Sequence, residues 1–169
     1  EFTAKPMLLA CLLTGTHYLD INGDIAVFEM IKHYDAAAKK TGVMLLPGIG
    51  FDVVPTDCIA LQLKKLLPDA AALKLAFATL GGGLSHGTAI TMAGKIGEGG
   101  AVRKEGKIIR SPLGQKGMTI DFGIKKLFVM SIPWGDVSTA HFTTAIPDIE
   151  TYTGISPKVY RMLKLQFLF

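Results

Sequence analysis

The chain has 169 residues, of which 49% are apolar, and a formal net charge of +4 at pH 7. This size and apolar content suffice for one substantial core or for parts of two domains, so we expect a folded globular protein. The modest charge, without a long Lys/Arg run, argues against a nucleic-acid-binding protein. The sequence has neither the pattern of a signal peptide nor an uncharged stretch of about 18 residues, so we expect a cytoplasmic protein.

The first third of the chain alternates predicted helices and strands. A short helix over 6–13 precedes the strand "THYLDI", which closes on Asp20, and a helix with a period of 3.6 residues follows over 27–41. The next strand, "VMLLPGI", is apolar throughout, as expected for a parallel strand covered on both faces. A further helix follows Pro55. Its predicted buried face consists of Ile59, Leu63, Leu66 and Leu67. This order predicts a layered α/β sheet.

The second part of the chain has a different pattern. "LKLAFATLGGG" predicts a strand that runs into glycines, and "SHGTAITMAGKI" predicts a helix with Ser85 at its start. The runs "KIIRSP", "MTIDFG" and "KLFVMSI" predict short strands separated by Gly and Pro turns. They indicate a second sheet, antiparallel or mixed. A last helix is predicted from Ser156, and the apolar ending "KVYRMLKLQFLF" makes us expect a fragment.

Two glycine turns are candidates for phosphate binding. A dinucleotide fingerprint needs three glycines, spaced GxGxxG, whereas the first turn supplies only Gly48 and Gly50 and adds the carboxylate of Asp52. The second turn, 81–88, follows a strand and opens a helix, so its amides are suited to an anion, but it lacks the Lys-Ser/Thr pair of a P-loop. Neither turn therefore predicts a complete pyrophosphate site.

The loops at the carboxyl ends of the first two strands are the predicted ligand-binding region. Asp20 ends one strand and the loop 48–57 follows the other, so both are expected to face one crevice. The alternative is structural: Asp52 or Thr56 caps the following helix and Asp57 complements its dipole. The two readings are compatible, because a cap also lines a site.

Other polar and aromatic residues give weaker signals. His86, beside Ser85 at a predicted helix start, is the best histidine candidate, but no carboxylate is visibly paired with it, which does not support a Ser-His-Asp hydrolase. Trp134, in "IPWGD", is either a packing anchor or a wall of an active site. Cys11 and Cys58 have no metal-binding spacing, and no metal site is predicted.

Four segments resemble a known family. "GTHYLDINGD", "LLPGIGFDVVPTDCIA", the turn with "SHGTA", and "IPWGDVSTAHFTTAIPDIETY" occur in the order found in the saccharopine dehydrogenase-like oxidoreductases, which include the trans-acting enoyl reductases. The resemblance implies an α/β fold in which residues 1–50 are the C-terminal part of a Rossmann-like parallel sheet, without its N-terminal Gly-rich motif. Residues 51–169 would form an α+β substrate-binding and dimerisation domain with a mixed sheet, truncated at its C-terminus.

The resemblance also implies roles for the residues of the loops. The cofactor would be NAD or NADP, and the cofactor-binding candidates are Asp20, Gly48, Gly50 and Phe51. The substrate-binding candidates are Asp52, Pro55, Thr56, Ser85, His86 and Trp134. Where saccharopine-forming enzymes have Asp-Pro-Gly and then Asp-His, this chain reads "DVVPTDC". Saccharopine itself is therefore not the expected substrate, and no catalytic acid or base is assigned.

The predicted function is hydride transfer to or from a C=N, C=C or C=O bond of a small or lipid-like metabolite, by a parent protein that forms a homodimer. Such chemistry depends chiefly on orienting a cofactor against a substrate, so a missing catalytic base is tolerable. The alternative is a non-catalytic domain for dimerisation or for peripheral contact with a membrane or lipid surface. The basic middle segment and the apolar ending favour this alternative.

Overall fold

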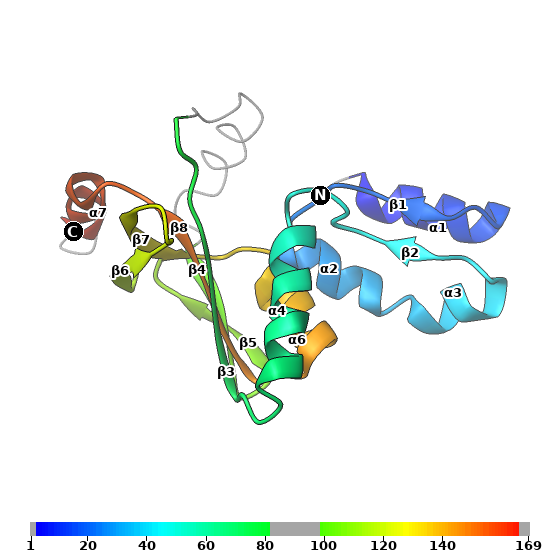
Figure 1. Ribbon diagram of the computed structural model, residues 1–169. Helices are drawn as coiled ribbons and strands as arrows, with labels where there is room; N and C mark the ends of the chain where they lie inside the picture. The colour runs from blue at the N-terminus through cyan, green and yellow to red at the C-terminus, as the bar shows by residue number, and fades with distance from the viewer. Residues whose placement is uncertain (1–2, 82–98, 166–169) are drawn as a thin grey trace.

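The computed structural model describes residues 3–81 and 99–165, which form two layered units (Figure 1). The helix predicted after the second glycine turn, with Ser85 and His86, lies outside the described residues. The elements of the first unit are α1 (Ala4–Thr14), β1 (Tyr18–Leu19), α2 (Ile25–Lys32), α3 (Asp35–Thr41) and β2 (Leu45–Leu46). Those of the second are α4 (Val54–Leu66), β3 (Ala72–Phe77), β4 (Gly100–Lys104), β5 (Lys107–Ser111), β6 (Gly117–Asp121), β7 (Lys126–Ile132), α6 (Asp136–Thr144), β8 (Asp148–Gly154) and α7 (Pro157–Leu165).

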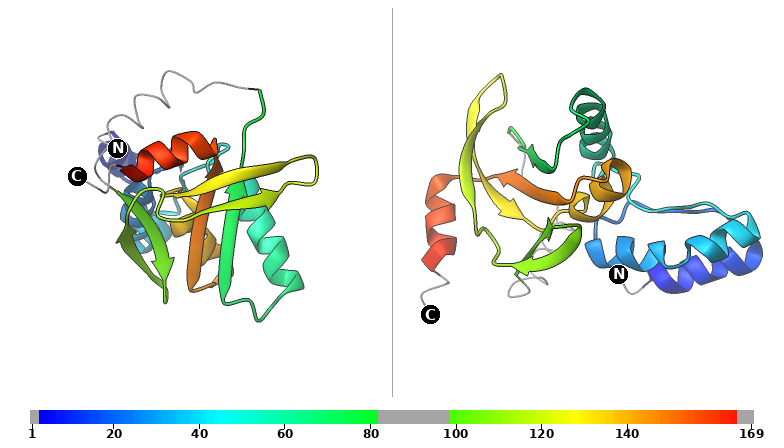
Figure 2. Two further views of the ribbon diagram at one scale, coloured as in Figure 1. Left: turned by 90° about the vertical axis from the view of Figure 1, so that its left-hand side faces the viewer. Right: turned by 90° about the horizontal axis from the view of Figure 1, so that it is seen from below.

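The first unit is a parallel strand pair covered on one face by helices. β1 and β2 pair in parallel, Tyr18 with Leu45 and Leu19 with Leu46. The helices α1, α2 and α3 lie on the same side of the strands (Figure 2), where they enclose a core around Leu8 and Val27. Leu19 and Leu46 point to the other face and are exposed. The α/β class is thus confirmed, while the Rossmann-like arrangement stays a prediction.

The helix predicted over 27–41 is in fact two helices. α2 ends at Lys32 and α3 begins at Asp35, with Tyr34 between them at φ −96° and ψ 5°. The ring of Tyr34 contacts the cluster that α1 and α2 form. Tyr34 and Ala38, which are four residues apart, both lie on the side of α1, so the break does not change which side of this segment faces the core.

The second unit is built on a mixed sheet with β8 at its centre. The strand order is β5-β4-β8-β7-β6, and β3 pairs with β8 in parallel along its whole length. On the edge of β8 opposite β3, β8 pairs antiparallel with β4 at Ile149 and with β7 from Thr151 to Gly154. The predicted strands in "KIIRSP", "MTIDFG" and "KLFVMSI" are confirmed as β5, β6 and β7. The prediction of a second, mixed sheet is confirmed as well.

Helices cover this sheet at two places. α4 and α6 lie against one face, as Figure 1 shows, and Ala60, Leu75 and Ile149 belong to the core between them and the strands. At the end of the sheet formed by β6 and β7, α7 lies on the β6–β7 hairpin (Figure 2), where the rings of Tyr160 and Phe128 have centroids 5.0 Å apart. Within the described ranges, no helix is long and apolar enough to cross a membrane.

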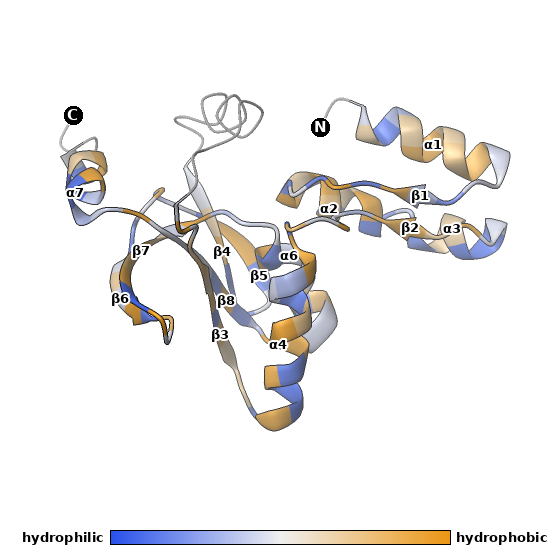
Figure 3. Ribbon diagram, turned by 45° about the horizontal axis from the view of Figure 1, so that its top comes forward, coloured by the Kyte–Doolittle hydropathy of each residue, from blue (hydrophilic) through white to orange (hydrophobic). Residues whose placement is uncertain are grey.

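The predicted buried face of α4 is wrong. Of its residues Ile59 is 55% exposed and Leu66 is 76% exposed, whereas Ala60 is fully buried. Figure 3 shows α4 with orange, apolar segments alternating with blue, polar ones. The reason is tertiary: Ala60 belongs to one buried cluster with Leu73 and Leu75 of β3 and Ala140 of α6, so α4 turns this small side chain to the core.

Candidate functional site

Asp20 organises the carboxyl ends of the two parallel strands. Its Oδ1 accepts hydrogen bonds from the amides of Asn22 (2.9 Å) and Gly48 (3.1 Å), and its Oδ2 accepts one from the hydroxyl of Tyr18. Burial and the bond to Asp20 raise the pKa of Tyr18 above its usual range. Asp20 therefore fixes the loop that leaves β2 to the end of β1, as two neighbouring strand ends of an α/β sheet require.

The glycines of this loop are required by the packing of the chain itself. Gly48 has φ +72°, and a Cβ atom there would lie 2.7 Å from Cζ of the buried Phe28. A Cβ atom at Gly50 would lie 3.3 Å from Cβ of Ile21. In a phosphate-binding turn the phosphate packs closely against the glycines. Here the side chains of Phe28 and Ile21 pack against them instead.

Replacing Gly48 by alanine is expected to destabilise the protein by roughly 2–4 kcal/mol, since the left-handed conformation and the overlap with Phe28 both act against a Cβ atom. Gly42 has φ +67° and no atom within 4 Å of a Cβ position, so Gly42→Ala should cost only about 1–2 kcal/mol. Urea unfolding of both variants measures the difference. Equal losses would show that Phe28 does not constrain the loop.

Asp52 lies where three loops meet. A Cβ atom at Gly23 would lie 1.7 Å from Oδ2 of Asp52, and one at Gly135 would lie 3.2 Å from Oδ1. The side chain therefore occupies the space between the loop after β1 and the loop before α6, and both glycines are needed to admit it. This places the predicted substrate-binding residue Asp52 at the junction of the two units.

An aromatic row extends from the same junction. The ring of Phe77, on β3, stands edge-on to Phe51 with centroids 5.7 Å apart and is tilted against Trp134 at 4.5 Å. Phe51 is 62% exposed, and the buried Nε1 of Trp134 has no hydrogen-bond acceptor among the residues that the structure describes. Phe77, which the sequence did not indicate, thus connects the cofactor-binding candidate Phe51 with the substrate-binding candidate Trp134.

The beginning of α4 differs from the predicted cap. Val53 takes the N-cap position, so neither Asp52 nor Thr56 does, and the Thr56 hydroxyl donates to the carbonyl of Val53 at 3.1 Å. Pro55 lies within the first helical residues, where its missing N–H costs nothing. Asp57 lies in the first turn, as predicted for a charge that complements the dipole, and its Oδ2 accepts from Thr143 of α6 at 2.6 Å.

Asp136, the first residue of α6, is the most perturbed carboxyl group near the junction. Its side chain is fully buried, and within the described residues neither oxygen has a hydrogen-bond donor at bonding distance. Burial is the main cause that raises its pKa to about 7, and the nearby Asp57 carboxylate adds to the shift. The only sequence signal for Asp136 is its place two residues after Trp134 in "IPWGD".

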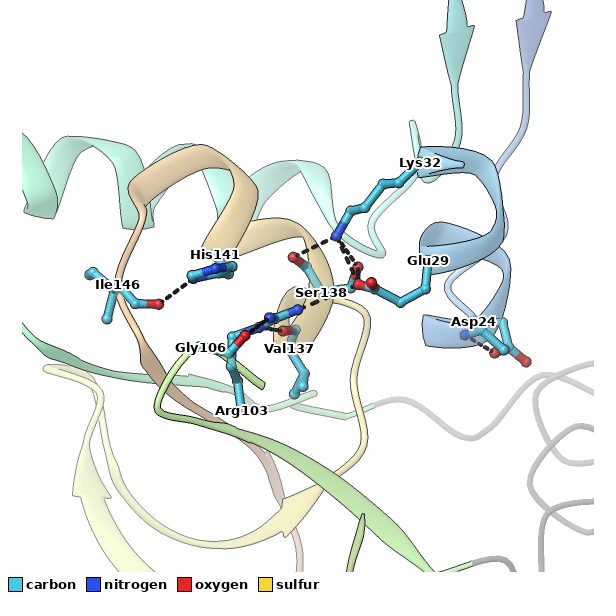
Figure 4. A network of polar contacts seen from close by, with 10 residues as sticks. Asp24, Glu29, Lys32, Arg103, Gly106, Val137, Ser138, His141 and Ile146 are labelled. Atoms are coloured by element: carbon cyan, nitrogen blue, oxygen red, sulfur yellow. Dashed lines mark hydrogen bonds and ion pairs between the residues drawn. The ribbon is translucent and has the colours of Figure 1, made fainter. Parts of the chain in front are cut away.

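A polar network joins the two units (Figure 4). Glu29 of α2 accepts hydrogen bonds through Oε1 from Lys32 (2.8 Å), Ser138 (2.5 Å) and the guanidinium of Arg103 (3.4 Å). Burial alone would raise the pKa of Glu29, but its partners hold it below the usual range. Arg103 also donates to the carbonyls of Val137 (2.8 Å) and Gly106 (2.6 Å). Its side chain is only 6% exposed, so this network fixes the orientation of α2 against α6 and β4.

The structure thus brings part of the predicted site together. Phe51, Asp52 and Trp134 come together at the junction, and Asp20 and Gly48 hold the loop that carries the first two. Ser85 and His86 lie outside the described residues. In the described part of the chain no group of three or more His, Cys, Asp or Glu side chains is arranged to hold a metal ion.

These features define an α/β protein in which the strand ends of a small parallel sheet border a mixed-sheet unit. Among curated proteins, the chain is similar to the saccharopine dehydrogenase-like oxidoreductase of Rattus norvegicus, with 28% identity over 111 residues. The protein of that name from Bos taurus is 29% identical over 85 residues, and the one from Homo sapiens is 34% identical over 59 residues. This similarity confirms the resemblance that the sequence motifs indicate.

The matches are partial in both directions. The alignment with the rat protein covers 62% of this chain and 26% of the rat protein; for the human protein these shares are 34% and 14%. The matched region therefore spans about a quarter or less of the length of these relatives. No protein-family model matches the chain.

Proposed function

We propose that this chain is part of an NAD(P)-dependent oxidoreductase that transfers a hydride to or from a C=N, C=C or C=O bond of a small or lipid-like metabolite. The observation that carries the proposal is the junction itself. Phe51, Asp52 and Trp134 meet beside the carboxyl ends of β1 and β2, the place where α/β sheets bind ligands. The names of the similar curated proteins support the same class.

The residues of the junction fit the nicotinamide ring of a dinucleotide but not its pyrophosphate. Phe28 and Ile21 fill the space where a Cβ atom would stand at Gly48 and Gly50, so a pyrophosphate cannot pack against the two glycines on that side. The exposed ring of Phe51, backed by Phe77, offers a flat apolar surface suited to a nicotinamide ring. In this proposal Asp20, Gly48, Gly50 and Phe51 shape the cofactor side.

The substrate side of the proposed site is formed by Asp52, Pro55, Thr56 and Trp134. The bound cofactor supplies the hydride, and the chain contributes orientation and exclusion of water. The buried indole N–H of Trp134 is available to an acceptor oxygen if the ring turns toward a ligand, and Asp52 adds a carboxylate for a basic or hydroxyl group. An apolar wall with few polar groups suits a metabolite that is largely hydrocarbon or planar.

Calorimetric titration with NADH and NADPH tests this proposal, both on the 169-residue chain and on a full-length protein that contains it. We expect the full-length protein to bind one of the two, and Phe51→Ala to weaken that binding by about 3- to 10-fold through lost ring contact. Phe142→Ala, which removes an exposed ring on α6, is the matched control and should change nothing. If the full-length protein binds neither nucleotide, the non-catalytic alternative replaces this function.

A further inference from the structure

The ring of Phe28, on α2, packs against two glycine-containing loops of the candidate site. A Cβ atom at Gly48, in the loop after β2, would lie 2.7 Å from its Cζ, and one at Gly135, in the loop before α6, would lie 2.6 Å from its Cε2. Phe28 itself is only 2% exposed. One buried side chain therefore touches the backbones of both loops, although the two glycines are far apart in the sequence.

Each of these glycines is close in sequence to residues of the candidate site. Gly48 precedes Phe51 and Asp52 in one loop, and Gly135 directly follows Trp134 in the other. The ring of Phe28 is thus a direct physical link between the loop on the cofactor side and the loop that carries the tryptophan.

The reason for a glycine at position 135 is this close approach. Gly135 has φ −51° and ψ −32°, which other residues adopt as readily, so its backbone conformation does not require glycine. Its Cβ position, however, lies within 2.7 Å of Cγ1 of Val53, at the start of α4, as well as close to Phe28. The place of the loop with Trp134 therefore depends on contacts with α2 and with the start of α4.

The helix that carries Phe28 is itself fixed against α6. Glu29, the next residue, accepts hydrogen bonds from the hydroxyl of Ser138 at 2.5 Å and from the guanidinium of Arg103 at 3.4 Å, and Figure 4 shows it turned toward both. Ser138 lies in the first turn of α6, directly after the loop with Gly135. α2 thus holds this loop by an apolar contact and a neighbouring polar one, which makes Phe28 a rigid support.

We propose that Phe28 is a positioning residue of the candidate site, which sets the separation between the loop that carries Phe51 and the loop that carries Trp134. Because it is buried, Phe28 acts through these loops and does not contact the ligand. A smaller side chain would leave a void into which the loops shift, and the row of rings from Phe51 through Phe77 to Trp134 would lose its spacing. The proposal rests on the proposed function, since that function uses the same site.

The fluorescence of Trp134 tests the proposal without a ligand. Trp134 is the only tryptophan of the chain, and its indole nitrogen is buried. Phe28→Leu should shift the emission of the folded 169-residue chain to longer wavelength and raise its quenching by acrylamide about 2-fold, because the loop opens locally. Circular dichroism checks the fold. Should Phe28→Leu not fold, Phe28→Met takes its place, since methionine adapts to irregular gaps.

Phe128→Leu is the matched control. Phe128 also packs its ring against a glycine, since a Cβ atom at Gly117 would lie 2.6 Å from its Cζ, but this contact is in the β6–β7 hairpin beside Tyr160. The control should leave the emission of Trp134 unchanged. A folded Phe28→Leu variant with the emission of the unaltered protein would overturn the proposal.

A double variant tests the contact between Phe28 and Gly135. Gly135→Ala places a methyl group against Cε2 of Phe28 and should also change the emission of Trp134. In Phe28→Leu/Gly135→Ala the shorter side chain makes room for that methyl group. The combined change should therefore be smaller than the sum of the two single changes. Strictly additive changes would show that the two positions act independently, which contradicts the proposal.

Nucleotide binding tests the consequence for the site. In a full-length protein that contains this chain, Phe28→Leu should weaken the binding of NADH or NADPH by about 3- to 10-fold, and Phe128→Leu should not change it. Equal affinity in Phe28→Leu and the unaltered protein would overturn the role of Phe28 alone. Binding of neither nucleotide by the unaltered protein would overturn the proposed function and this role together.

Discussion

Replacing Arg103 by methionine is expected to lower the free energy of unfolding by roughly 2–4 kcal/mol. Methionine keeps much of the apolar stem of the side chain but removes the donors to the carbonyls of Val137 and Gly106, which stay without their partner. Glu29 loses less, because Lys32 and Ser138 still donate to it. The loss should therefore reflect mainly the two carbonyls, and urea unfolding measures it.

Two controls separate the geometry of the guanidinium from its charge. Arg110 is exposed on β5, and Arg110→Met should change stability by less than about 0.5 kcal/mol. Arg103→Lys keeps the charge but has one ammonium in place of the planar fork, so it cannot serve Val137, Gly106 and Glu29 at once and should recover only part of the loss. If Arg103→Met were no more harmful than Arg110→Met, the network would not hold the two units together.

The second large expected effect is on the pH dependence of stability. Because the pKa of Asp136 is raised to about 7 in the folded protein, the folded state keeps this proton over a range where the unfolded state has lost it. Below about pH 4 both states are protonated and the group has no effect. Between about pH 4 and 7 stability falls as pH rises, and above pH 7 the full penalty is present. Asp136 thus destabilises the protein at neutral and alkaline pH.

Asp136→Asn removes this titration and should flatten the profile. Relative to the unaltered protein, the variant should gain about 2–3 kcal/mol of stability between pH 5 and pH 8. The change with pH is the measured quantity, since any packing cost of the buried amide is the same at both pH values. Denaturant unfolding at several pH values measures it, with the exposed Asp69→Asn as the matched control. Parallel profiles for Asp136→Asn and the unaltered protein would contradict a raised pKa at Asp136.

The sequence predicted local structure well where turn residues and periodicity agree. β5, β6 and β7 are recognisable because Gly and Pro separate three β-rich runs, and α7 because Pro157 opens an amphipathic run. No strand was predicted for β4, whose segment "GGAVRKEGK" is rich in Gly and charged residues, and it is held in the sheet by pairing such as that of Arg103 with Ile149 of β8. That pairing joins residues far apart in the chain, and no local pattern encodes it.

In the candidate site too, the sequence indicated some neighbours and only the assembled fold revealed the others. The sequence indicated that the loop after Leu46 would lie beside Asp20, because neighbouring parallel strands end at one edge of a sheet. It did not indicate Phe77 or Asp136 as neighbours of that loop. Phe77 arrives on β3 and Asp136 on α6, and both positions depend on how the mixed sheet is assembled.

By itself the sequence determined the alternation of helices and strands, the two kinds of sheet and the family resemblance, since these depend on local periodicity, turn residues and short motifs. Only the tertiary structure decided which side of α4 is buried. A 3.6-residue period identifies an apolar stripe but not what the stripe meets, and here the sheet accepts Ala60 while Ile59 and Leu63 face outward. The burial of Arg103 and Asp136 was decided in the same way, because desolvation depends on every segment that surrounds a side chain.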